Sequence, residues 1–294
     1  MVKFFWPAFA KALAGERKNI EIVWSWRPKK QIAADKPKAM KTFKFILIIA
    51  FFALHHTTSG WGATGHRAVG LIAERNLSPA VKKKLLKILR GESLAMASTW
   101  MDDIRSDSTY DYTSDWHWVT IENGKSYDES PKNPKGDVIM TLERVISELK
   151  SKKLTARQEV EHLKMLIHLV GDIHQPLHVG CCDDTGGNRV KVKWFRDDSN
   201  LHRVWDSEMI DHSKLSYTEL ANAIAMPGKE EIAKLQKATV RDWAKESMNM
   251  RKQVYAVGDG NLGYKYSYKN LDSAKHRIML AGIRLAGILN SIYK

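Results

Sequence analysis

Apolar residues recur at helical spacing along much of the chain, and this pattern predicts a mainly α-helical protein. In the first such segment, residues 63–76, the side chains of Val69, Ile72 and Ala73 share one helix face. The other segments expected to be helical are 78–89, 136–150, 156–174, 201–211, 217–226, 229–252 and 271–292. The last of these has a wide apolar stripe, which indicates a largely buried helix.

One short segment has a different pattern. Residues 188–195 alternate between polar and apolar positions after Gly186 and Gly187, which is typical of a short strand or hairpin. No linker rich in Ser, Gly or Pro divides the sequence after residue 60, and it contains no internal repeat. Residues 61–294 are therefore expected to form a single compact, mainly α-helical domain with a short β-hairpin.

From Met40 onwards the sequence has the organisation of a secretory signal peptide. Lys41 and Lys44 precede an apolar run over 45–54, and small and polar residues follow as far as Gly60. The run is too short for a stable transmembrane helix, which needs about 20 residues. We expect residues 40–60 to be a signal peptide that is cleaved after Gly60, giving a secreted or periplasmic protein without a membrane span. The alternative is a buried core helix.

Residues 1–39 precede this complete signal and are basic and poorly patterned. We interpret them as the product of a misassigned start codon, with Met40 as the initiator, or else as an extended n-region of the signal. The whole sequence has 47 Lys+Arg, 33 Asp+Glu and a net charge of +14. Residues 1–60 carry 11 and 3 of these, so residues 61–294 keep 36 and 30, a net charge of +6. That charge suits a polyanionic substrate, but it is equally common in soluble secreted proteins.

The sequence contains only two cysteines, Cys181 and Cys182, which are adjacent. They exclude a disulfide framework, and they either form a strained vicinal bridge or remain free thiols. A bound metal would have to supply the stabilisation that disulfides give many exported proteins.

Histidine and aspartate residues are concentrated in two short segments, HLVGDIHQPLH from His168 to His178 and HRVWD from His202 to Asp206. His168 and Asp172 are four residues apart, as are His202 and Asp206, so each pair lies on one helix face about one turn apart. Imidazole nitrogens and carboxylate oxygens at this separation can bind one zinc ion. A single pair would be weak support, but two pairs with His178 between them indicate a metal site.

The start of the expected mature chain, WGATGH from Trp61 to His66, also offers ligands. Cleavage after Gly60 would give Trp61 a free α-amine, which can chelate a metal together with its own carbonyl oxygen in a five-membered ring. An α-amine has a pKa of about 8, so zinc can displace its proton near neutral pH.

Two further elements, WMDDIR over 100–105 and WHW over 116–118, complete an ordered set. Together with the elements above, this set resembles the zinc-dependent single-strand nuclease family of the S1/P1 type. The resemblance covers essentially all of residues 61–294, including the closing AGIRLAGILN over 281–290. It implies the helical fold of zinc phospholipase C and of the single-strand nucleases.

The resemblance also implies a cofactor of three zinc ions with nitrogen and oxygen ligands only, as in catalytic zinc sites. One ion would be bound by Asp102, His117, His168 and Asp172. A second would be bound by the Trp61 amine and carbonyl, by His66 and by the other oxygen of Asp172, so that Asp172 bridges the two. The third would be bound by His178, His202 and Asp206.

The function implied by the resemblance is that of an endonuclease and 3′-nucleotidase. Such an enzyme hydrolyses 3′-O–P bonds of single-stranded DNA and RNA, and of 3′-nucleotides, to release 5′-nucleotides. A hydroxide bridging the two zinc ions that share Asp172 would attack phosphorus, and the third zinc would stabilise the leaving oxygen. The substrates are nucleic acids and 3′-nucleotides, and no stable protein partner is implied.

Three residues are candidates for substrate contacts. Arg105 resembles the arginine that contacts phosphate in the family, although it can instead pair with Asp102 or Asp103. Trp118 resembles an aromatic residue on which a base stacks, although it can instead belong to the core. Asn188 is expected to line the cleft.

One position departs from the family pattern. Many relatives have an acidic residue three positions after the histidine of the WH element, whereas this chain has Thr120. A hydroxyl can hold a water molecule but cannot act as a base at neutral pH. The substitution therefore bears on the rate and pH dependence of the reaction and leaves its class unchanged.

The other histidines match no ligand position and are expected to be surface or packing residues, namely His162, His174, His212 and His276. Trp100, Trp116 and Trp205 flank candidate ligands and are expected to form the walls of the site. Asp103 is expected to face solvent or to support the site without binding metal.

Two other functions are compatible with these residues. A related trinuclear zinc phospholipase has similar helices and an amino-terminal tryptophan ligand, but a glutamate in its third site. The present chain has Asp206 there, and its QPLH and LHRVWD elements favour the nuclease. The other alternative is a secreted zinc-binding protein without catalytic activity.

Overall fold

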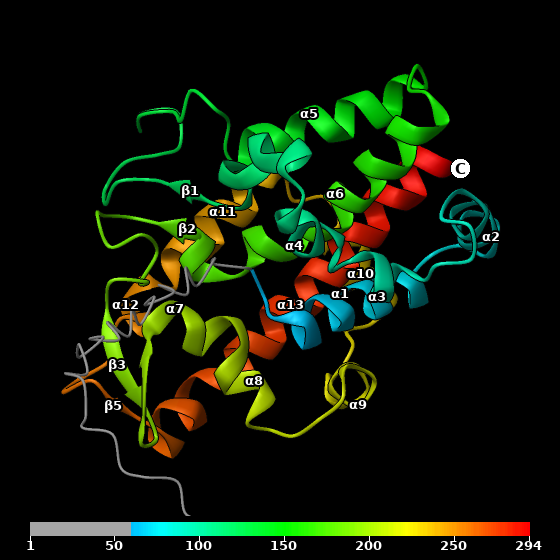
Figure 1. Ribbon diagram of the computed structural model, residues 1–294. Helices are drawn as coiled ribbons and strands as arrows, with labels where there is room; N and C mark the ends of the chain where they lie inside the picture. Colours follow the sequence, from blue (N-terminus) through cyan, green and yellow to red (C-terminus); the bar gives the residue numbers. More distant parts are fainter. Residues whose placement is uncertain (1–59) are drawn as a thin grey trace, which may run out of the picture. The chain divides into compact units, whose positions relative to one another are not determined.

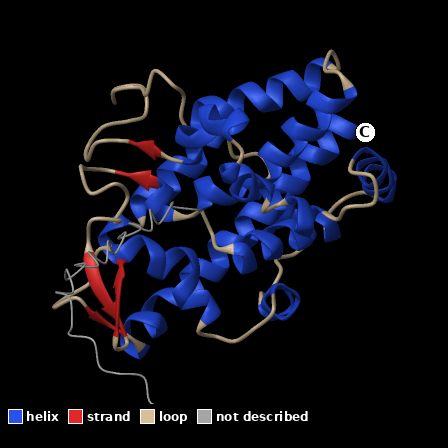
Figure 2. Cartoon of the chain, viewed as in Figure 1, coloured by secondary structure: helices blue, strands red, loops and turns tan. Residues whose placement is uncertain are grey.

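The computed structural model describes residues 60–294, which are mainly helical, with a few short strands on one side (Figures 1 and 2). The predicted mainly α-helical fold is confirmed. The segment 1–39 and the predicted signal peptide, apart from Gly60, lie outside the described residues. In the described part of the chain, no helix is both long and apolar enough to cross a membrane.

Most helices follow one another with short connections, but longer non-helical segments precede α5 and α7. The α-helices are α1 (Ala63–Arg75), α2 (Pro79–Ile88), α3 (Leu94–Ala97), α4 (Trp100–Asp103), α5 (Val138–Ser151), α6 (Ala156–His174), α7 (Leu201–Arg203), α8 (Met209–Asp211), α9 (Tyr217–Ala223), α10 (Lys229–Leu235), α11 (Val240–Asn249), α12 (Arg251–Val254) and α13 (Tyr264–Tyr293). The tighter 3-10 helices are η1 (Ile104–Ser106), η2 (Ser108–His117) and η3 (Pro176–His178), and η4 (Val204–Glu208) is a π-helical turn.

The strands form two small sheets. The predicted hairpin is confirmed, with β3 (Lys191–Trp194) antiparallel to β4 (Asp197–Asn200), and β5 (Asn261–Leu262) pairs parallel to β3. The second sheet joins β1 (Val119–Thr120) in parallel to β2 (Val179–Gly180). This pairing brings the segment after His117 beside the segment after His178.

Helices α1, α6 and α13 pack together at the centre of the molecule, and α13 crosses it diagonally (orange to red in Figure 1). Helix α6 begins with a capping box, in which Thr155 and Gln158 satisfy each other's backbone amides. It ends before Pro176, which cannot continue the helix. From Leu163 to His174 every residue of α6 except Lys164 is buried, so both its apolar and its polar side chains face protein.

The largest differences from the predicted helices are at two places. The segment 229–252, expected to be one helix, is divided into α10, α11 and the start of α12. The division occurs because Thr239 forms a capping box with Asp242. This cap, four residues after Leu235, starts the new helix α11. The last helix begins at Tyr264 and not at 271, so its solvent-exposed first turns escape a prediction based on apolar periodicity.

A buried ionic cluster joins α13 to α11. The guanidinium groups of Arg277 and Arg284 are almost fully buried, and both donate to the carboxylate of Glu246, at 2.6 and 2.7 Å. Burial on its own would raise the pKa of Glu246, but the hydrogen bonds from Arg284 and Arg277 outweigh it and hold this pKa below its usual value. The same Arg284 donates to Nε2 of buried His174, which therefore has a packing role, as predicted.

Glu246→Gln should lower the free energy of unfolding by about 2–3 kcal/mol near neutral pH, because it leaves two buried guanidinium groups without their counter-charge. We place the loss below that of a fully buried pair because the Glu246 side chain is 37% exposed. Since the folded pKa of Glu246 is lowered, its contribution is present above its usual pKa and is lost as pH falls through the folded value. The gap between wild type and variant in urea titrations should therefore shrink below about pH 4.5.

The matched control is Glu230→Gln, which removes an exposed carboxylate at the start of α10. It should change stability by less than about 0.5 kcal/mol. Equal effects of the two substitutions would show that the Glu246 cluster contributes nothing specific.

Candidate metal centre

Three groups of histidine and aspartate side chains each place their ligand atoms within 4.8 Å of one another. The first contains His66, His168 and Asp172, the second Asp102, His117 and His168, and the third His178, His202 and Asp206. Every predicted side-chain ligand therefore belongs to a group that can hold a metal ion. Each residue in these groups had also been predicted as a ligand.

The ligands come from elements that are far apart in sequence. Helix α6 supplies His168 and Asp172 from one face, as their spacing predicted. The other ligand-bearing elements are α1 with His66, α4 with Asp102, the end of η2 with His117, the end of η3 with His178, α7 with His202 and the π-turn η4 with Asp206. All these side chains except that of Asp102 are buried.

A glycine in α6 makes room for the His66 ring. A Cβ at Gly171 would lie 2.7 Å from Nδ1 of His66, a distance that real Cβ contacts do not reach. The imidazole therefore packs directly on the helix backbone and stacks on the His168 ring, with centroids 4.0 Å apart. Any side chain at position 171 would displace His66 from the first group.

Both carboxylate oxygens of Asp172 face imidazole nitrogens. Oδ1 lies 3.2 Å from Nε2 of His66, and Oδ2 lies 2.9 Å from Nδ1 of His117. Oδ2 is also 3.2 Å from Nε2 of His168. The two oxygens thus point towards different groups, which is the arrangement that a bridging carboxylate requires.

Asp172 is fully buried, yet its surroundings favour the ionised carboxylate. Burial on its own would raise its pKa, but the charges of His168 and His178 and the hydrogen bond with His117 outweigh burial and hold the pKa well below its usual range. The converse holds for His178, because burial disfavours its charged form, yet the carboxylates of Asp172 and Asp206 raise its pKa to about 9. For His117 burial has the largest effect on the pKa and lowers it to about 4.

Backbone carbonyls orient three of the histidines. Nδ1 of His168 donates to the Ser98 carbonyl at 2.7 Å. In the same way Nδ1 of His178 donates to the carbonyl of His117 at 2.7 Å, and Nδ1 of His202 to that of Gly186 at 2.6 Å. A neutral histidine that donates through Nδ1 presents an unprotonated Nε2, which is the form that binds metal.

These bonds aim ring nitrogens at each other. Nε2 of His178 and Nε2 of His202 are 3.1 Å apart, and Nε2 of His168 and Nδ1 of His117 are also 3.1 Å apart. With Nδ1 of His178 and of His202 already donating to carbonyls, the two Nε2 atoms can lie this close only with a proton or a metal cation between them. A shared zinc ion, with Zn–N bonds of about 2.0–2.1 Å, accounts for this convergence. The donor set therefore fits the metal.

The third group has a supporting residue that the sequence analysis did not single out. Nε2 of Gln175 donates to Oδ1 of Asp206 at 2.6 Å, and Oε1 of Gln175 accepts from the amide of Leu177 at 2.6 Å. Gln175 thus couples the turn before His178 to the aspartate of the same group. Its place in the QPLH element was the available signal.

The backbone before Trp61 lies against the first group. A Cβ added to Gly60 would overlap the Asp172 carboxylate and come within 2.9 Å of Nε2 of His66. The side chain of Trp61 is fully buried, and the amide of Gly62 donates to the carbonyl of Asp206 at 2.6 Å. The start of the expected mature chain is therefore anchored beside the predicted ligands.

A cavity of about 620 Å³ adjoins the third group. Residues that line it include His178, His202, Trp118, Thr120, Asn188 and Arg189. The ring of Trp118 is 37% exposed, so this residue is not part of the core. The predicted substrate-contacting residues Trp118 and Asn188, and the divergent Thr120, thus lie in one cavity.

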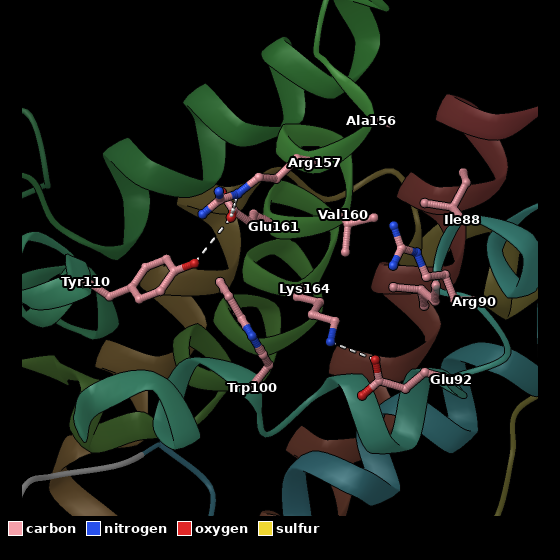
Figure 3. Close-up of a pocket in the computed structure, with 11 residues that line it drawn as sticks. Ile88, Arg90, Glu92, Trp100, Tyr110, Ala156, Arg157, Val160, Glu161 and Lys164 are labelled. Atoms are coloured by element: carbon pink, nitrogen blue, oxygen red, sulfur yellow. Dashed lines mark hydrogen bonds and ion pairs between the residues drawn. The ribbon is translucent and has the colours of Figure 1, made fainter. Parts of the chain in front are cut away.

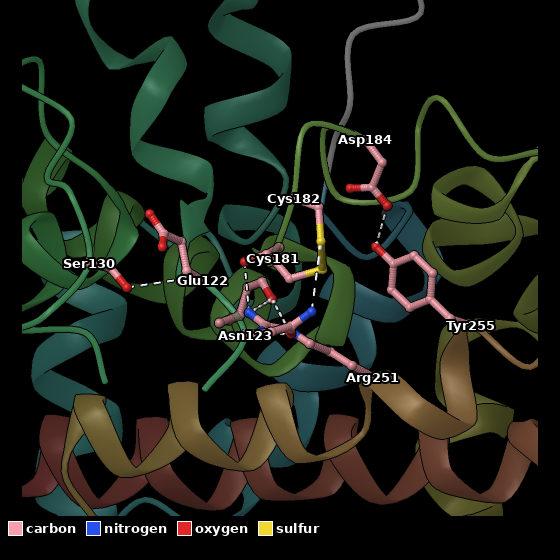
Figure 4. Close-up of a disulfide and its surroundings, with 10 residues drawn as sticks. Glu122, Asn123, Ser130, Cys181, Cys182, Asp184, Arg251 and Tyr255 are labelled. Atoms are coloured by element: carbon pink, nitrogen blue, oxygen red, sulfur yellow. Dashed lines mark hydrogen bonds between the residues drawn. A yellow bond between two sulfur atoms is a disulfide. The ribbon is translucent and has the colours of Figure 1, made fainter. Parts of the chain in front are cut away.

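The loop that borders this cavity contains a disulfide between Cys181 and Cys182, one of the two alternatives left open by the sequence (Figure 4). Cys182 is among the lining residues. Arg251 donates to the carbonyls of Val179 and Gly180 at 2.8 and 2.7 Å, and Tyr255 donates to Asp184 at 2.7 Å. These contacts from α12 and the residue after it fix both ends of the loop.

Three other residues singled out in the sequence, Arg105, Asp103 and Trp205, lie outside the metal-binding groups. Arg105 pairs with Asp102 at 3.1 Å, and Asp103 accepts a hydrogen bond from Thr99 and joins no metal-binding group. Contact of Arg105 with phosphate stays a prediction. Trp205 is fully buried and donates to the hydroxyl of Tyr266 at 2.8 Å.

Comparisons with known proteins show the family to which the chain belongs. The S1/P1 nuclease family profile matches residues 61–294. The chain is 32% identical over 278 residues to Endonuclease 3 of Arabidopsis thaliana, covering 84% of this chain and 94% of the relative. It is 28% identical over 178 residues to Nuclease S1 of Aspergillus oryzae, covering 58% and 61% of the two chains, and 28% identical over 160 residues to Nuclease P1 of Penicillium citrinum, covering 51% and 58%. The protein with this buried histidine–aspartate centre therefore belongs to the S1/P1 nuclease family.

Proposed function

We propose that the protein is a zinc-dependent endonuclease and 3′-nucleotidase that hydrolyses 3′-O–P bonds of single-stranded DNA and RNA to give 5′-nucleotides. The observation that carries the proposal is the set of three metal-binding groups of histidine and aspartate side chains, the third of which lies beside a cavity lined by Trp118. Family membership supports the nuclease activity. The zinc identity, the number of three ions and the ligand assignments are parts of the proposal.

Nine residues would hold the metal. Asp102, His117, His168 and Asp172 would bind one ion, the Trp61 amine and carbonyl with His66 and Asp172 a second, and His178, His202 and Asp206 a third. When bound, the ions supply Lewis acidity, which lowers the pKa of water to furnish the nucleophile and stabilises charge on the leaving 3′-oxygen.

The protein's own residues position the substrate. The exposed ring of Trp118 stacks a base, which excludes duplex DNA because paired bases hide their faces. Arg105 binds a phosphate oxygen through the guanidinium nitrogens that do not contact Asp102. Thr120 and Asn188 line the cavity, where the Thr120 hydroxyl can hold a water molecule. Neither residue acts as a base, because a hydroxyl and a carboxamide do not accept a proton at neutral pH.

The phospholipase is disfavoured by Asp206, because that family has a glutamate in the third site. A non-catalytic zinc protein is disfavoured by the cavity, which gives a substrate access to the third group. We further propose that residues 40–60 direct export and that cleavage after Gly60 creates the amino terminus at Trp61.

Asp172→Asn should lower release of 5′-nucleotides from denatured DNA by more than about 100-fold. Residues that merely orient metal ligands contribute about 10- to 100-fold, and the proposed role of Asp172 is to bind two ions directly. Metal content by plasma mass spectrometry should fall at the same time. Asp103→Asn, a nearby exposed acid outside the metal-binding groups, is the control and should keep its activity. Full activity of a folded Asp172→Asn enzyme would refute the bridging role, and choline-lipid hydrolysis without nuclease activity would favour the phospholipase.

One glycine added before Trp61 should reduce activity at least about tenfold, because the amine ligand becomes an amide nitrogen that binds zinc poorly. The measurement is nuclease activity of the purified enzyme before and after a protease removes the extra glycine. Activity should return on removal. If the extended and correctly cut enzymes are equally active, Trp61 is not a ligand.

A further inference from the structure

A groove of about 670 Å³, separate from the Trp118 cavity, is lined in part by residues that are close in sequence to ligands of the second metal-binding group (Figure 3). It lies between the end of α2, α4, η2 and the first half of α6, and its lining residues include Arg90, Glu92, Trp100, Tyr110, Arg157 and Lys164. We infer that this groove binds the nucleotides on the 3′ side of the scissile phosphate. The inference rests on the proposed nuclease function and deepens it.

The position of the groove on α6 connects it to the metal centre. Lys164, His168 and Asp172 are spaced by four residues, so they form a row along one face of the helix. At a rise of about 1.5 Å per residue, Lys164 lies about 6 Å along the helix axis from His168, and Arg157 about 16 Å from it. Trp100, in turn, lies two residues before the ligand Asp102 on α4. A strand that leaves the metal centre therefore reaches the groove within a few nucleotides.

Aromatic rings in and beside the groove offer stacking surfaces. Trp100 and Tyr110 meet edge to face with centroids 5.4 Å apart, and the Tyr112 ring follows at 6.4 Å from Tyr110. Tyr112 is 56% exposed, an unusual environment for a large aromatic side chain that has only a packing role. Such rings bind unpaired bases without regard to sequence, because every base has a π-face.

Cations surround these rings. Nζ of Lys164 is 5.9 Å from the Trp100 ring centroid and pairs with Glu92 at 2.7 Å. Arg157 contacts Glu161 through Nε at 2.9 Å, and its side chain is 84% exposed, so its terminal nitrogens face solvent. Within residues 60–294, Arg90 has no carboxylate partner.

The groove thus has an excess of positive charge, because Arg90, Arg157 and Lys164 outnumber Glu92 and Glu161. Basic side chains interleaved with aromatic rings are the combination that binds single-stranded nucleic acid, phosphates on the cations and bases on the rings. An anion without bases, or a purely apolar ligand, matches only one of these two features.

The direction of the strand follows from the proposed reaction. The third group stabilises the leaving 3′-oxygen, so the nucleoside on the 5′ side of the scissile bond occupies the adjoining Trp118 cavity. The chain on the 3′ side then continues past the Asp102–His117–His168 group towards Trp100 and Lys164, which line the groove. A 3′-nucleotide has a phosphate but no such continuation, and it therefore serves as an internal control.

The test compares an oligodeoxynucleotide of about eight residues with 3′-adenosine monophosphate. Tyr110→Ala should lower kcat/KM for the oligonucleotide about tenfold, mainly through KM, and leave hydrolysis of the mononucleotide within about twofold. Tyr110→Phe keeps the ring but loses the hydrogen bond to Glu161, and it should behave like wild type.

A charge-matched pair of variants tests the cations. Arg90→Gln with Arg157→Gln should weaken oligonucleotide binding and reduce the slope of log K against log salt by about 1.4, since each single-strand phosphate contact contributes about 0.7. The control, Lys229→Gln with Lys265→Gln, removes the same charge from exposed positions on α10 and α13 and should leave the slope unchanged.

Either of two results would overturn the inference. One is no loss for the oligonucleotide in any groove variant. The other is an equal loss for both substrates, which would show that the groove residues act on the metal centre itself. If the wild-type enzyme hydrolyses neither substrate, the proposed function fails. If the wild-type enzyme cleaves both substrates and the groove variants cleave them equally well, the proposed function stands and only the inference about the groove fails.

Discussion

The need to stabilise the buried carboxylate of Asp172 is the constraint on which the rest of the site depends. A fully buried carboxylate is stable only when charges or donors surround it, and here His66, His117 and His168 do so at 2.9–3.2 Å. Those rings are aimed in turn by Gly171 and by the carbonyl of Ser98. The packing of α1 and α4 on α6 is therefore part of the metal centre and not merely a scaffold for it.

The parts of the site that were predictable from sequence are those encoded locally. His168 and Asp172, like His202 and Asp206, lie one turn apart by helical spacing alone, and the order of the motifs pointed to the family. The role of Gly171 was not predictable, because it depends on a ring from another helix, and the QPLH element marked Gln175 without indicating its partner Asp206. The groove was missed for the same reason, since α2, α4, η2 and α6 each contribute only a few ordinary residues to it.

The fold shows the same division between local and distant determinants. Apolar periodicity located α1, α5 and α6 to within two residues. It failed over 229–252, where the capping residue Thr239 overrides a continuous helical pattern, and at the exposed start of α13, where few apolar residues mark the helix. Capping chemistry and solvent exposure, more than hydrophobic pattern, set these boundaries.

The single disulfide of the described chain joins neighbours, so it closes no loop and restrains none of the long connections between helices. The candidate ligands, by contrast, span residues 66 to 206 and come from elements on both sides of α6. Bound ions would thus act as cross-links between distant segments, and resistance to digestion by proteases would depend on metal supply. The enzyme would then be durable only where that supply is maintained.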